Sequence, residues 1–210
     1  MYTVSTSNYH HGNLREALLA AGLEKLESEQ SPEFSLRELT RQVGVSVNAA
    51  YRHFASKDDL LCAMAAEGFR LLCVDQAAAM QADTVEQGFR EAGRAYVNFA
   101  RRHPALFRLM FSRFAVTNRN DELNAGAQLA YDGMRFGVAA ILNKPVENAD
   151  VKIVSMFAWS LVHGLSHLII DGQFDIHTDD IDGLVDAVLQ HAAAPLTVPP
   201  LQAARQKTKP

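Results

Sequence analysis

Apolar side chains recur every three or four residues along most of the chain, which is the spacing of amphipathic α-helices. A first apolar stripe runs between Asn13 and Glu29, and shorter stripes follow within residues 36–43 and 47–54. No segment keeps the strict alternation of apolar and polar residues that marks a half-buried strand. The pattern therefore predicts an all-α protein.

Residues typical of helix N-termini precede several of these stripes. Ser46 is predicted to cap a helix, but Ala49, three residues later, offers no carboxylate to complete a capping box. The N–H groups at the start of that helix are therefore open to another anion, although many short helices simply lack a box. Three other pairs have the spacing of a capping box: Asn13 with Glu16, Ser35 with Glu38, and Ser56 with Asp59.

Two domains and a tail are expected from the order of these stripes. Residues 1–55 hold an N-terminal arm and a three-helix bundle. Between Ser35 and Phe54, two of these helices are joined by a turn at Gly44 and form a helix-turn-helix. Residues 56–194 form a helical domain that begins with a connecting helix over 56–82. Residues 195–210, rich in proline and basic near the end, are predicted to be a flexible tail. Further helices are expected over 84–103, 104–112, 121–143, 148–171 and 179–194.

The second helix of the helix-turn-helix has the composition of a DNA recognition helix. Ala50 and Phe54 lie four residues apart and can dock it onto its neighbours. Asn48 can pair with an adenine edge and Arg52 with guanine or phosphate, which are contacts made in the major groove. A solvated polar helix face is the alternative. The predicted DNA contacts are Ser35, Arg37, Ser46, Val47, Asn48, Tyr51, Arg52, His53 and Lys57.

The distribution of charge supports that interpretation. The whole chain carries a net charge of −4, but residues 35–57 hold four cations and one acid, a local balance of +3. Lys57 is expected at the first position of a helix, where it opposes the macrodipole unless a phosphate lies beside it. Residues 171–186 carry much of the compensating negative charge. One face made for a polyanion is therefore expected.

Bulky, adaptable apolar side chains in the middle helices predict a ligand pocket between bundle helices, although such residues are also common in plain cores. The proposed occupant is a small-molecule effector. If the effector is acidic, four arginines are candidates to recognise it: Arg101, Arg102, Arg108 and Arg113. Arg101 and Arg102 also suit a helix C-terminus, where cations are favourable. The expected pocket residues are Met110, Phe111, Phe114, Met134, Phe157, Trp159 and His163.

The helix expected over residues 148–171 is apolar on nearly all sides and must be buried on nearly all sides. Together with the last helix it can pair with its symmetry mate in a four-helix bundle, which predicts a homodimer. An ordinary core helix within one chain is the alternative. The expected interface residues are Leu161, Leu165, Leu168, Leu184 and Val188.

Other functional classes have weaker support. His163, His167 and Asp171 have a spacing that allows metal ligation from one helix edge, which would suit a metal-dependent enzyme, but nothing else completes the site. No catalytic motif, metal or cofactor is therefore predicted, and a protein-interaction scaffold remains a second alternative. Two cysteines without a motif, no signal peptide and no uninterrupted apolar span predict a cytoplasmic protein without a membrane segment.

The stretch "FSLRELTRQVGVSVNAAYRHFASKDDLL" resembles the DNA-binding region of the TetR (tetracycline-repressor-like) family of bacterial transcriptional regulators, over roughly residues 9–64. The family often has glycine at the position of Asn48. "AWSLVHGLSHLI" resembles the Trp–His–Gly signature (Trp159, His163 and Gly164) in the C-terminal domain of one subgroup of the family. "HPALFRLMF" resembles a segment that accompanies this signature in the same subgroup. The resemblance implies a homodimer that binds double-stranded, palindromic operator DNA and a repressor released by a small effector in the C-terminal domain.

Overall fold

The computed structural model describes residues 14–118, 120–174 and 180–192, and within those ranges every regular element is an α-helix. The all-α prediction is confirmed. The helices are α1 (Leu14–Glu29), α2 (Leu36–Val43), α3 (Val47–Tyr51), α4 (Lys57–Ala79), α5 (Val85–Arg102), α6 (Pro104–Met110), α7 (Arg113–Thr117), α8 (Asp121–Leu142), α9 (Ala149–Ile170) and α10 (Ile181–Ala192).

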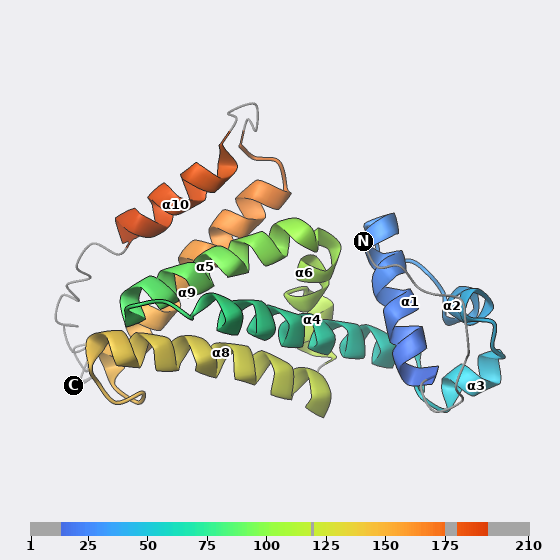
Figure 1. Ribbon diagram of the computed structural model, residues 1–210. Helices are drawn as coiled ribbons and strands as arrows, with labels where there is room; N and C mark the ends of the chain where they lie inside the picture. Colours follow the sequence, from blue (N-terminus) through green and yellow to red (C-terminus); the bar gives the residue numbers. More distant parts are fainter. Residues whose placement is uncertain (1–13, 119, 175–179, 193–210) are drawn as a thin grey trace, which may run out of the picture.

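Helices α1, α2 and α3 form a small bundle at one end of the molecule, and α4 leads from it into the larger domain (Figure 1). Leu18 and Leu39 are fully buried in this bundle, and Ala50 and Phe54 fill the space beneath α3. The packing explains how a helix of five residues, too short to be stable in water, is held in place.

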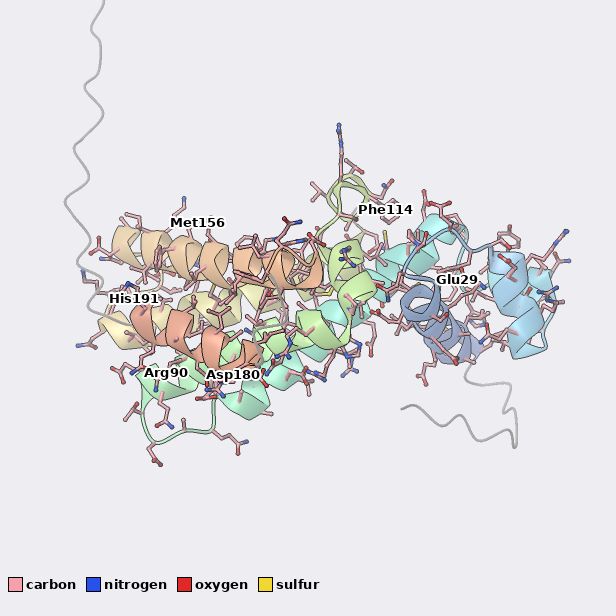
Figure 2. All side chains as sticks on the ribbon, turned by 90° about the horizontal axis from the view of Figure 1, so that it is seen from above. Glu29, Arg90, Phe114, Met156, Asp180 and His191 are labelled. Carbon is pink, nitrogen blue, oxygen red and sulfur yellow. The ribbon has the colours of Figure 1, made fainter. Side chains whose placement is uncertain are left out.

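The larger domain is a layered bundle in which α4 and α5 lie against α8 and α9, with α10 on the far side of α5 (Figure 1). Val97 of α5 meets Leu165 of α9 and Val185 of α10 in one buried cluster. Ion pairs of α5 arginines with Asp182 and Asp186 also join α10 to α5, and Figure 2 shows α10 from its outer side, between the labels of Asp180 and His191. The domain therefore presents two long helices, α8 and α9, beside the central pair.

One buried apolar core runs without a break from α1 into the larger domain. A Cβ atom added at Gly22 of α1 would lie 3.0 Å from the Sδ atom of Met64 in α4. Since α4 completes the packing of α1, the first half of α4 serves both units. The boundary expected between residues 55 and 56 thus falls inside continuous packing.

Most expected helix limits lie within a few residues of the observed ones. One difference is α7, which follows the short helix expected over residues 104–112 in a stretch for which no helix was predicted. The Ser112 hydroxyl caps α7 by accepting a bond from the Ala115 N–H. The expected Asn13 cap, the start of the last helix at Asp179 and the 195–210 tail lie outside the described residues.

Helix α9 keeps much apolar surface exposed. Met156 and Phe157 are each 45% exposed and Leu168 is 44% exposed. Among the described residues, α9 alone is long and apolar enough, with a mean hydropathy of 1.6, to meet the length and composition test for a membrane span. The sequence-based argument from its interrupting polar residues missed this, and core helices of soluble proteins pass the same test.

Candidate DNA-binding helix and effector cavity

Local sequence signals place the recognition helix α3. Gly44 ends α2 with φ of 78°, in the left-handed region that glycine adopts without strain, and Ser46 then caps α3 by accepting a bond from the Ala49 N–H at 3.2 Å. Ala50 is 0% and Phe54 is 3% exposed. The buried pair fixes which side of α3 faces outward.

The outward side of α3 carries the polar residues that the sequence singled out. Asn48, Arg52 and His53 are exposed, Tyr51 is 52% exposed, and Val47 is partly buried. The remaining predicted DNA contacts, Ser35, Arg37 and Ser46, are also exposed, while Lys57 is partly buried. The nine predicted residues thus lie at the starts of α2 and α4 and along α3 or just before or after it, at the end of the molecule formed by α1, α2 and α3 (Figure 1).

Within residues 14–118, 120–174 and 180–192, the cations around α3 have no acidic partner. Among the described residues no carboxylate forms an ion pair with Arg37, Arg41, Arg52 or Lys57. Several arginines of the larger domain, in contrast, are paired with aspartates, namely Arg94, Arg101, Arg102, Arg108 and Arg135. Lys57 Nζ lies 5.6 Å from the centre of the Phe34 ring, a cation–π contact that restricts where its charge is held.

The one acid of residues 35–57, Glu38, is already occupied. Glu38 closes the capping box of α2, where its carboxylate accepts bonds from the Ser35 N–H at 2.6 Å and the Ser35 hydroxyl at 2.9 Å. Those two hydrogen bonds lower the pKa of Glu38 below its ordinary value. The capping box predicted for α2 is confirmed, and it turns the carboxylate toward its own helix.

A cavity of about 1220 Å³ lies between α4, α5, α8 and α9. Its wall is mostly apolar, with a few polar side chains that include Gln76, Asn124 and Gln128. The volume exceeds the roughly 300–1,000 Å³ usual for sites of small ligands. The larger side chains of its wall are Phe69, Leu72, Met80, Phe89, Tyr96, Phe111, Leu129, Tyr131, Met134, Ile141, Leu142, Met156, Phe157, Trp159 and Leu161.

The structure divides the seven residues expected to line a pocket. Phe111, Met134, Phe157 and Trp159 lie on the cavity wall, whereas Met110, Phe114 and His163 do not. Met110 is 2% exposed and packs instead against α4, because Gly68 leaves room for its side chain there. The wall residues contributed by α4 and α5 were missed, since core and cavity positions share one apolar pattern.

A part-buried chain of hydrogen bonds begins at the cavity wall. Trp159 Nε1 lies 3.4 Å from the Tyr96 hydroxyl, which lies 2.9 Å from His163 Nδ1. Burial raises the pKa of Tyr96, and burial together with nearby His167 lowers the pKa of His163. The neutral imidazole is therefore favoured, with the Tyr96 O–H donating to Nδ1 and the indole N–H donating to the phenol oxygen.

The three side chains considered as metal ligands have other partners. His163 bonds to Tyr96, whereas Asp171 accepts a bond from Arg108 at 2.7 Å and lies 3.5 Å from His167 Nδ1. The hydrogen bond from Arg108 lowers the pKa of Asp171. In the ranges that the structure describes, no three histidine, cysteine or acidic side chains are grouped as a metal site requires.

The residues expected at a dimer interface are not equivalent. Leu168 and Leu184 are exposed, Leu161 and Val188 are partly buried, and Leu165 is 6% exposed. Leu165 points into the cluster between α5, α9 and α10, so its contacts are within the chain. The exposed apolar side chains of α9 and α10 nevertheless lie on outward surfaces of the larger domain.

The comparisons with protein families agree with this arrangement. Residues 18–64 match the family described as bacterial regulatory proteins, tetR family, and residues 89–192 match the family described as tetracyclin repressor-like, C-terminal domain. The chain belongs to the TetR family. As a TetR-family protein it is a DNA-binding transcriptional regulator, and the N-terminal match contains α2, α3 and the start of α4. No curated protein matches the chain.

Solved structures share the complete two-unit fold. A protein of unknown function from Rhodococcus sp. RHA1 is 28% identical, with a TM-score of 0.71 over 88% of this chain and 94% of that one. A TetR family regulator from Marinobacter aquaeolei VT8 is 15% identical, with a TM-score of 0.64 over 85% and 93%. A TetR variant from Acinetobacter baumannii AYE, in complex with minocycline, is 17% identical, with a TM-score of 0.59 over 89% and 96%.

Proposed function

We propose that this TetR-family regulator is a homodimeric repressor that binds a palindromic operator and is released by a small-molecule effector. The observation that carries the proposal is the surface of α3 and its surroundings, where exposed hydrogen-bonding side chains lie beside cations that have no acidic partner among the described residues. Phosphates of a duplex are the natural partners of such cations, and base edges are the natural partners of the residues between them.

The roles of the nine DNA-contact residues follow from their positions. Asn48, at the second position of the exposed α3, would pair with an adenine edge, and Val47 would contact a thymine methyl group. Arg52 would contact guanine or a phosphate. Ser35, Arg37, Ser46, Tyr51, His53 and Lys57 would hold the protein on the phosphate backbone.

The exposed apolar residues of α9 and α10 support a homodimer. Leu168 on α9 and Leu184 on α10 would meet their counterparts around a two-fold axis, in a four-helix bundle. Two recognition helices about 34 Å apart would then enter successive major grooves, which is why a palindromic operator is expected.

The cavity between α4, α5, α8 and α9 is the proposed effector site. A related fold in complex with minocycline supports a small-molecule ligand here, although nothing ties that compound to this chain. A ligand that prefers a bundle state with a different separation of the recognition helices would weaken operator binding by its difference in affinity for the two states. Because the operator lies in the bacterial cytoplasm, the regulator would act there and needs no membrane.

The proposal is tested by selecting bound fragments from random double-stranded DNA and measuring their affinity by retardation at several salt concentrations. Enrichment of an inverted repeat, bound more tightly than scrambled DNA, is expected. In the same assay Asn48→Ala should change the preferred bases, because a bidentate base contact contributes about 1–3 kcal/mol of discrimination. Binding that is absent, or indifferent to sequence in the unaltered protein, would contradict the proposal.

A further inference from the structure

Helix α6 lacks a cap of its own and receives one from the DNA-binding unit. His103 precedes the helix without a side-chain cap, and Pro104 occupies its first position. The next two N–H groups, of Ala105 and Leu106, lie 3.2 and 2.9 Å from the two carboxylate oxygens of Glu27, near the end of α1. Charge-assisted bonds of this kind are stronger than neutral ones, and they satisfy N–H groups that a helix start leaves unpaired.

The contact connects the two units of the molecule. Glu27 is partly buried on α1, the helix whose apolar side shares a core with α2 and α3. A second polar link pairs Arg15 of α1 with Glu122 of α8, but both side chains are over one-third exposed, at 40% and 48%. Exposed pairs contribute little, so the Glu27 contact is the stronger polar constraint on α1.

The opposite end of α6 reaches the effector cavity. Phe111, which directly follows the helix, lies on the cavity wall, and Phe107 packs edge-on against the wall residue Tyr96 with ring centres 5.6 Å apart. Seven residues of α-helix span only about 10 Å. A displacement of the wall at Phe111 is therefore transmitted over one short, rigid element to the N–H groups that hold Glu27.

We propose that Glu27 is the positioning residue through which α6 orients the DNA-binding unit, so that operator affinity depends on a carboxylate that does not touch DNA. The inference rests on the proposed function, since it assumes a specific operator. A ligand that moves α6 would weaken or shift the contact with Glu27. The orientation of α1 and α3 relative to the larger domain would then change.

The test compares Glu27→Gln with Glu24→Gln, a control that removes the same charge from an exposed position of the same helix, where the Glu24 side chain accepts a bond from Gln42 Nε2 of α2 at 3.4 Å. Removal of a negative charge near DNA should by itself strengthen binding to all sequences slightly. Glu27→Gln is instead expected to weaken binding to the selected operator about tenfold, while binding to scrambled DNA becomes at most slightly stronger. Glu24→Gln should not weaken operator binding.

A second variant separates positioning from simple loss of helix stability. His103→Ser, added to Glu27→Gln, gives α6 a local cap that can accept the Leu106 N–H. Hydrogen exchange of the α6 amides should return toward that of the unaltered protein, while operator binding stays weak because the charged, two-oxygen link to α1 is still missing. Recovery of operator binding by the local cap would overturn the proposal.

The remaining outcomes are equally decisive. Operator binding by Glu27→Gln equal to that of the unaltered protein would overturn the role of Glu27 and leave the proposed function intact. Failure of the unaltered protein to prefer any selected DNA would instead refute the proposed function, and the role of Glu27 with it.

Discussion

At the scale of single residues, Lys57 joins three observations. It begins α4, it stacks on the Phe34 ring, and in the described ranges it has no acidic partner. A lysine at this end of a helix is unfavourable by about 0.3–1 kcal/mol unless an anion offsets it. The ring contact holds the ammonium group beside Phe34, just before α2, and near the start of α4.

Lys57→Ala should therefore weaken binding to operator and scrambled DNA alike. One lost phosphate contact reduces the slope of log affinity against log salt by about 0.9, and the preferred sequence should not change. Retardation assays at several salt concentrations measure both quantities. A change of sequence preference without a change of slope would assign Lys57 to base recognition instead.

His163 links the cavity wall to the stability of the fold. Burial and the nearby His167 lower its pKa, so below pH 6.5 the unfolded chain binds a proton that the folded chain resists. Stability is then complete above the unfolded pKa and declines as pH falls toward the lower folded pKa. His103, whose pKa is also lowered by burial, adds to the same decline.

The melting temperature should fall between about pH 7.5 and pH 5.5, and His163→Gln should reduce that fall without abolishing it. The same substitution at exposed His191 is the control and should leave the pH dependence unchanged. Thermal unfolding at a series of pH values provides the measurement. A melting temperature that depends on pH equally in all three proteins would exclude His163 as a source.

At the scale of helices, α6 is wedged between α4 and the cavity. A Cβ atom at Gly68 of α4 would lie 2.5 Å from Met110 Sδ and 3.1 Å from Leu106 Cγ, so alanine there requires these two side chains of α6 to shift. Overpacking of this kind costs about 1–3 kcal/mol.

Gly68→Ala is expected to lower the free energy of unfolding by that amount and, by displacing α6, to weaken operator binding. Gly133→Ala in α8 is a matched control, because nothing lies within 4 Å of its added Cβ and alanine favours the helix by up to about 1 kcal/mol. Chemical denaturation and operator titration measure the two effects. Unchanged operator binding would mean that α6 can shift without moving α1.

The sequence predicted helices far better than it predicted which side of each helix faces a cavity. Caps such as Ser35 and Ser46 act over three residues, and local spacing is enough to find them. Met110 and Phe111 are adjacent and both apolar, yet one fills the core and the other lines the cavity, a choice made by the space left at Gly68. Glu27 caps α6 by accepting a bond from the N–H of Ala105, which is 78 residues away in sequence. No local sequence pattern predicts a contact over that separation.

At the scale of the whole molecule, the proposed dimer would cover the exposed apolar residues Leu168 of α9 and Leu184 of α10. Leu168, 44% exposed on α9, lies on this proposed dimer surface, and a carboxylate there would have to be buried in the assembled dimer.

Leu168→Glu should give a folded monomer in sedimentation, with operator affinity reduced to the level of scrambled DNA because the two recognition helices are no longer joined. Val74→Glu, at a 53% exposed residue of α4, is the control and should remain dimeric. A dimer that survives Leu168→Glu would place the interface elsewhere.

The cavity wall also contains its own optical probe. Trp159 is the one tryptophan of the chain, and it borders the cavity beside Tyr131 and Phe111, with its indole N–H aimed at Tyr96. Indole emission is sensitive to polarity and to nearby quenchers, so a compound that enters the cavity should alter the fluorescence of the unlabelled protein. Libraries of metabolites and drugs can thus be screened directly, even before the operator has been identified.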